Sequence, residues 1–143
     1  MRSIGKFEVS RRQMYRSIPM LPLQEICKRI LEVHEGIRWV KIIDQQGKIA
    51  FEEKKSHVEP YLSEDAMKNL RELWIGVIQG IVGKVAQYWG APQHLHIQFS
   101  KVLVFGFPYI SGAVVITAET NVPLTTISKI QEILKKSYAV EQT

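Results

Sequence analysis

The feature that most constrains this 143-residue chain is its middle segment, residues 63–89, whose apolar pattern predicts one long helix. Ser63 can cap its start, and Glu64 and Asp65 favour the positive end of the helix dipole. The apolar side chains form one broad stripe of Met67, Leu70, Trp74, Val77, Ile78, Ile81, Val85 and Tyr88. Further apolar residues lie outside it, namely Leu73, Ile75, Val82 and Trp89. Because a helix with one side in water should be polar there, we expect this helix to be covered on both sides.

The centre of this helix has no charged residue between Glu72 and Lys84, and it contains three glycines. A glycine within a helix costs about 1 kcal/mol relative to alanine, so close approach of another backbone is expected in return. That backbone could belong to a second copy of the helix, which suits a two-fold dimer, or to the sheet of the same chain. The predicted dimer interface is Leu73, Gly76, Val77, Gly80, Gly83, Leu95 and Ile97.

The segments on either side of the helix predict an α+β fold. Helices are expected over 21–35 and 122–137, and strands over 37–43, 48–52, 93–100, 101–107 and 112–118. The order is helix, two strands, helix, three strands, helix. Short turns between sequential strands favour antiparallel pairing, so the prediction is a five-stranded antiparallel sheet with helices packed on it. This single domain is expected over 20–143, after an N-terminal arm of residues 1–19.

The arm carries most of the net charge. Residues 1–19 contain five Lys/Arg and one acid, whereas the remaining chain is nearly balanced. An arm of this kind could bind nucleic acid, an anionic membrane surface or an acidic protein, or could be a solvated leader. The residues that would contact an anionic partner are Arg2, Lys6, Arg11, Arg12 and Arg16.

Motifs for catalysis or for cofactors are weak. His94 and His96 lie two apart on one face of a strand, a spacing that can bind metal, but solvent-facing histidines are the favoured interpretation. Cys27 and His34 are two helical turns apart and cannot form a nucleophile–base pair, so Cys27 is predicted to be a core residue. Phosphate-binding glycine loops are absent from the sequence. We expect no enzyme activity, no cofactor, no metal and no small-molecule substrate.

The cysteine content and the lengths of the apolar segments bear on the cellular location of the protein. One cysteine allows no internal disulfide, and the basic first twenty residues lack the apolar stretch of a secretory signal. The most apolar segment, residues 74–86, is interrupted by Gln79 and Lys84 and is too short to span a bilayer. A cytoplasmic protein is expected.

The stretch from Gly36 to Ala50, GIRWVKIIDQQGKIA, resembles the glycine–strand–Asp-x-x-Gly–strand hairpin of the Roadblock family. That family is related to dynein light chains and to longin and profilin-like folds. The long helix and the strands over Gln98–Phe105 and Ser111–Thr117 extend the resemblance over about residues 21–137. It implies a homodimer or heterodimer formed by pairing of the central helices and extension of the sheet. It also implies a scaffold or a regulator of a small Ras-like GTPase, without an active site of its own.

Two functions are therefore carried forward, beside a third that rests on fold analogy alone: a small-molecule sensor, since profilin-like folds also occur in ligand-binding domains. The first is a dimeric, non-catalytic protein-interaction module that serves a small GTPase. The second is a nucleic-acid-associated protein that binds through the basic arm, for which steeply salt-dependent binding is expected.

Overall fold

The computed structural model describes residues 15–19, 21–110 and 112–142 and confirms the predicted α+β fold. Its elements are β1 (Tyr15–Pro19), α2 (Leu23–Leu31), β2 (Ile37–Ile43), β3 (Ile49–Lys54), α3 (Glu64–Lys84), α4 (Ala86–Trp89), β4 (Leu95–Gln98), β5 (Leu103–Tyr109), β6 (Gly112–Ala118), α5 (Thr126–Lys136) and β7 (Tyr138–Gln142). A five-stranded antiparallel sheet has the order β3-β2-β6-β5-β4. In the described part of the chain, no helix has the length and apolarity needed to cross a membrane.

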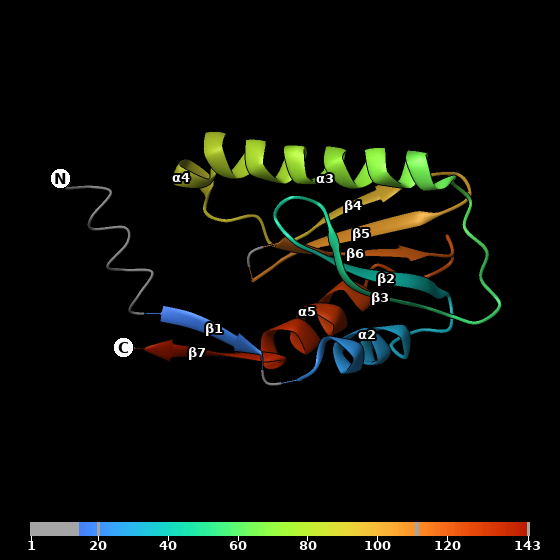
Figure 1. The fold of residues 1–143 in the computed structure, drawn as a ribbon, viewed down its shortest axis with the longest axis horizontal. Helices are drawn as coiled ribbons and strands as arrows, with labels where there is room; N and C mark the ends of the chain where they lie inside the picture. Colours follow the sequence, from blue (N-terminus) through green and yellow to red (C-terminus); the bar gives the residue numbers. More distant parts are fainter. Residues whose placement is uncertain (1–14, 20, 111, 143) are drawn as a thin grey trace.

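The sheet is covered on both faces, with α3 over one face and α2 and α5 over the other (Figure 1). Side chains alternate between the faces, so Phe105 and Ile116 join the core under α2 and α5. Their neighbours Val104 and Val115 pack in a second, smaller cluster under α3. Coverage of both faces explains why β5 and β6 are almost continuously apolar.

The hairpin between β2 and β3 forms where its turn residues predict. The Oδ1 atom of Asp44 accepts hydrogen bonds from the backbone N–H groups of Gln46 and Lys48, at 2.9 and 3.0 Å. Gly47 has a φ of 82°, a conformation that glycine adopts without strain. This turn carries the hairpin to the underside of α3, where the Gly47 carbonyl accepts a hydrogen bond from Arg71 Nε at 3.3 Å.

The long helix does not run unbroken to residue 89, so that part of the prediction is wrong. Val85 leaves the helical conformation with φ −124° and ψ −17°, and α4 begins at the next residue. Gly83 and Val85 are both weak helix formers, which lowers the stability of this turn. The amides of Tyr88 and Trp89 both donate to the Val85 carbonyl, at 2.9 Å each, so the helical hydrogen bonding restarts there.

The outer helices are shorter than predicted because local turns replace their ends. The predicted helix 21–35 is confirmed only over α2, and His34 Nδ1 instead accepts a 2.9 Å hydrogen bond from the Gly36 amide. The predicted helix 122–137 begins late, since the Pro123 carbonyl accepts from both the amide and the hydroxyl of Thr126. These polar contacts within the chain compete with helix formation.

A two-stranded ribbon of β1 and β7 was not predicted. The last five residues of the basic arm form β1, which pairs antiparallel with β7 so that Arg16 lies opposite Glu141. This ribbon lies on the side of the sheet that holds α2 and α5 (Figure 1). Arg2, Lys6, Arg11 and Arg12 lie outside the described residues, and the anion-binding role of the arm stays a prediction.

Candidate functional site

The outer face of α3 carries all five of its predicted interface residues, and all five are exposed. Leu73 and Val77 are 63% and 43% exposed. A Cβ atom placed on Gly76, Gly80 or Gly83 would meet no atom of the described chain within 4 Å. The alternative that these glycines allow close packing on the chain's own sheet is therefore wrong.

The inner face of α3 is held on the sheet by Trp74, which is only 5% exposed. Its ring lies directly over Gly106 of β5, where a Cβ atom would come within 2.7 Å of the ring carbon Cζ3. Leu70, Ile75 and Ile78 pack beside it as half-buried side chains. Close approach of helix and sheet is thus provided by a strand glycine, and a glycine inside an apolar strand is the sequence signal for it.

Strand β4 forms one edge of the sheet and adds to the same exposed surface. Leu95 is half-buried and packs with the cluster under α3. Ile97, two residues on, is on the same face and is 46% exposed. The structure therefore brings Leu95 and Ile97 to the α3 side of the sheet, next to an edge at which another strand could pair. We use the name α3–β4 surface for the seven predicted residues, Leu73, Gly76, Val77, Gly80, Gly83, Leu95 and Ile97.

A cavity of about 320 Å³ lies between α3 and the sheet. Met67, Leu70 and Trp74 of α3 line one wall, and Val104 and Val115 of the sheet line another. The sequence patterns did not predict this cavity, because it depends on how far a single large anchor, Trp74, holds the helix from the strands.

Lys41 of β2 is the unusual side chain in the cavity wall, since it is charged and only 9% exposed. Its Nζ atom lies 4.6 Å from the centre of the Trp39 ring and 3.9 Å from the sulfur of Met67. Within the described residues it forms no salt bridge. Burial lowers the pKa of Lys41 from its usual value; Glu52 opposes this and Arg71 adds to it. A lysine within an apolar strand is the sequence signal for this site.

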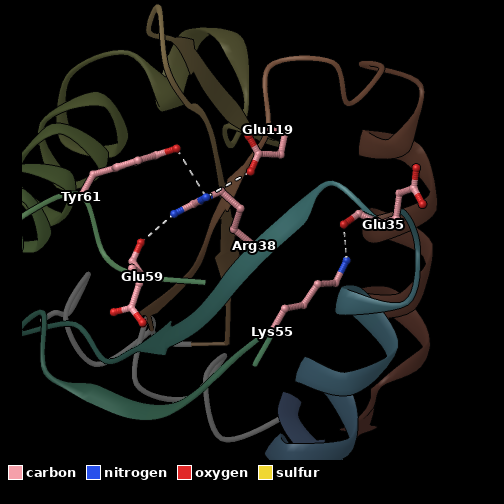
Figure 2. Close-up of polar contacts among 6 residues, drawn as sticks. All are labelled: Glu35, Arg38, Lys55, Glu59, Tyr61 and Glu119. Atoms are coloured by element: carbon pink, nitrogen blue, oxygen red, sulfur yellow. Dashed lines mark hydrogen bonds and ion pairs between the residues drawn. The ribbon is translucent and has the colours of Figure 1, made fainter. Parts of the chain in front are cut away.

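Arg38, at the mouth of the cavity, fixes the loop that precedes α3 (Figure 2). It donates to the Glu59 carbonyl at 2.8 Å and to the Glu119 carboxylate at 3.0 Å. Its guanidinium carbon lies 4.3 Å from the centre of the Tyr61 ring. On the other side of the same loop, Lys55 donates to the Glu35 carbonyl at 2.6 Å. One wall of the cavity is therefore held by specific polar contacts.

The two histidines are exposed, as predicted, and their rings stack with centres 6.3 Å apart. His94 also lies 3.4 Å from the amide nitrogen of Gln131 in α5. In residues 15–19, 21–110 and 112–142, no third His, Cys, Asp or Glu joins them in a group suited to a metal.

Cys27 is a core residue, as predicted, with no exposed surface. Burial, with smaller contributions from Glu53 and Glu52, raises the pKa of its thiol to about 12 from the usual 9.0. Since the thiolate is the nucleophile, Cys27 is unsuited to catalysis at neutral pH.

Cys27 should therefore resist alkylation in the folded protein. At pH 8 we expect iodoacetamide to react at least about 1,000-fold more slowly than with the urea-unfolded chain, because the pKa is about three units higher and the sulfur is buried. Mass spectrometry of a time course measures both rates. Comparable rates would contradict the burial of this residue. The same shift predicts that stability falls as pH rises above about 9, where only the unfolded thiol ionises.

No protein-family model and no curated protein sequence matches the chain, but solved structures do. The gliding protein MglB from Thermus thermophilus is similar with a TM-score of 0.63, at 14% identity, over 85% of this chain and 95% of that chain. A Roadblock/LC7 domain from Streptomyces avermitilis gives 0.61 at 12% identity, over 79% and 91%. An MglB structure with a tetrameric arrangement gives 0.60 at 13% identity, over 85% and 98%. These likenesses establish a Roadblock-like fold.

Proposed function

We propose that this chain, with its Roadblock-like fold, is a non-catalytic dimeric interaction module that binds a small Ras-like GTPase. The α3–β4 surface would be its dimer interface. The observation that carries the proposal is the exposure of Gly76, Gly80 and Gly83 on the apolar outer face of α3, where a Cβ atom would meet no other part of the described chain within 4 Å.

The glycine positions suit a second helix. At 3.6 residues per turn, the five α3 residues of the surface fall within about a third of the helix circumference. Three glycines there reduce helix stability, and nothing described within the chain offsets that loss. A second copy of α3 laid across this face would bury Leu73 and Val77 and use the space above the glycines. Such a contact is self-complementary, as a two-fold axis requires.

Strand β4 supports the same arrangement. Its outer edge carries unpaired backbone groups, and its exposed Ile97 lies on the α3 side of the sheet. Pairing with the β4 of a second copy would continue the sheet across the dimer and cover an edge that otherwise invites aggregation. The solved MglB with a tetrameric arrangement gives an example of self-association on this fold.

The dimer is tested by light scattering coupled to size exclusion, at low and high salt. We expect a mass near twice 16.5 kDa that changes little with salt, because the proposed interface is apolar. A monomeric mass at all protein concentrations would contradict the proposed homodimer.

The GTPase partner comes from the Roadblock resemblance, and the lack of a catalytic role is part of the same proposal. The purified protein should be titrated with a small Ras-like GTPase from the same organism, loaded with GDP or with a non-hydrolysable GTP analogue. We expect binding that depends on the nucleotide. If the protein is a stable dimer but binds no such GTPase in either nucleotide state, the proposed partner is wrong and the proposed dimer is not affected.

A further inference from the structure

We propose that the cavity beneath α3 binds an amphipathic organic anion, with its apolar body between α3 and the sheet and its acidic group at Lys41. The ligand class is a medium-chain or aromatic carboxylic acid. This site goes beyond the proposed function, which uses the exposed outer face of α3.

The shape of the cavity suits a small organic molecule. Its volume of about 320 Å³ is at the lower end of the range for ligand pockets, which are mostly apolar with a few polar groups. Side chains from α3, the sheet and the loop before α3 enclose it, including Leu70, Val115 and Tyr61. The contacts of Arg38 hold that loop in place, so this wall is formed without a ligand.

Charge selects the class of ligand. Three cationic residues line the cavity, Arg38, Lys41 and Arg71, and no acidic side chain is part of its described lining. Arg38 is paired with Glu119, and Arg71 donates to the Gly47 carbonyl. The ammonium of Lys41 contacts a sulfur and an aromatic ring and is nine-tenths buried. Glu52, opposite Lys41 on β3, and Glu64 attract it, but neither forms a salt bridge with it in the described chain. A buried charge without a directly contacting counter-ion is costly, and a ligand carboxylate at this point would offset that cost.

Other occupants suit the cavity less well. The N-terminal arm carries Arg2, Lys6, Arg11 and Arg12, whose charge would be repelled by the cationic lining. A second copy bound to the outer face of α3 would contact the exposed side chains Leu73 and Val77, whereas the buried Trp74 faces the sheet. Both the charge and the placement thus favour a separate small anion.

The experiment compares ligands with the same chain and different head groups. Calorimetry on the full-length protein would use decanoate, decanol and decyltrimethylammonium below their aggregation limits, and tryptophan emission would report on Trp39 and Trp74 in the cavity wall. We expect decanoate to bind at least about tenfold more tightly than decanol, and the cation not to bind. Equal affinity for all three, or no binding of decanoate, would overturn the proposal.

A variant pair tests the role of Lys41. Lys41→Met replaces the side chain with an unbranched apolar one that is a single heavy atom shorter and uncharged, so decanoate affinity should fall about tenfold or more while decanol still binds. Lys68→Met removes an exposed lysine of α3 and should leave both affinities unchanged. Circular dichroism and retained decanol binding show that Lys41→Met is folded. Unchanged decanoate affinity in Lys41→Met would overturn the proposal.

The proposed ligand site and the proposed dimer can be tested separately. Decanoate binding should persist in a monomeric Gly80→Leu variant, because a Cβ at Gly80 contacts no described part of the chain. Persistence supports a site within one chain, whether or not the wild-type protein is a dimer. If that monomer no longer binds decanoate, the site requires two chains and this proposal is wrong.

Discussion

Gly80→Leu is expected to convert the proposed dimer into a folded monomer. A Cβ atom at Gly80 would meet no other part of the described chain within 4 Å, so we expect the monomer to accommodate a leucine there. Leucine is also a better helix former than glycine, by somewhat less than about 1 kcal/mol, so the isolated helix should gain stability. A loss of dimer with an intact or raised monomer stability is therefore the specific expectation, and general unfolding is not expected.

The size of the effect follows from the symmetry of the interface. Overpacking a close contact costs about 1–3 kcal/mol, and a two-fold dimer contains two copies of each substitution. If both copies lie in the close contact, dimerisation weakens by about 2–6 kcal/mol. That corresponds to roughly one and a half to four powers of ten in Kd. Sedimentation velocity over a dilution series measures this change.

Lys68→Leu is the matched control for this experiment. It adds the same side chain to an exposed position of α3, twelve residues or about 18 Å along the helix, and off the face that carries the glycines. Its Kd should stay within a few-fold of the wild-type value. If Gly80→Leu remains a dimer with unchanged Kd, α3 is not the interface, and the three glycines would need another explanation.

The sequence was most informative where the signal was local and periodic. The turn between β2 and β3 was predictable from Asp44 and Gly47 alone. The Asp44 side chain can accept hydrogen bonds from the nearby backbone, and glycine adopts a positive φ without strain. The apolar pattern of α3 indicated that its apolar residues extend beyond a single sheet-facing stripe, because periodicity assigns residues to faces. The pattern did not distinguish packing against a partner from packing on the chain's own sheet. The open space around Gly80 in the structure makes that distinction.

The cavity and the β1–β7 ribbon could not be predicted from local patterns, because both depend on contacts between residues that are far apart in the sequence. Pairing of β1 with β7 joins residues more than a hundred positions apart, and neither strand has a pattern that identifies the other. The environment of Lys41 depends on side chains of α3 and of several strands of the sheet, which come together only in the folded chain. Arg38 likewise meets Glu59, Tyr61 and Glu119 only after the chain has folded. Composition and spacing carry little information on contacts of this kind.

Trp74→Ala should produce the largest loss of stability among single substitutions in α3. Trp74 is 5% exposed and is the largest side chain of the smaller core cluster, where it covers Gly106. Removal of a buried aromatic side chain costs about 3–5 kcal/mol. For a chain of this length that lowers Tm by roughly 10–20 °C. Thermal unfolding at one fixed protein concentration measures the shift, because the stability of a dimer depends on concentration.

The part of the protein that loses stability in Trp74→Ala shows whether Trp74 mainly holds α3 on the sheet or stabilises the whole domain. The core under α2 and α5 is separate from the cluster around Trp74. Hydrogen exchange should therefore show amides of α3 losing protection first, while those of α5 around Ile130 keep more of theirs. Trp89→Ala is the matched control, because Trp89 is 83% exposed in α4 and its loss should change the stability of the monomer by less than about 0.5 kcal/mol. If Trp74→Ala were as mild as Trp89→Ala, α3 would be held mainly by its partner in the dimer, and Gly80→Leu should then release α3 from the sheet as well.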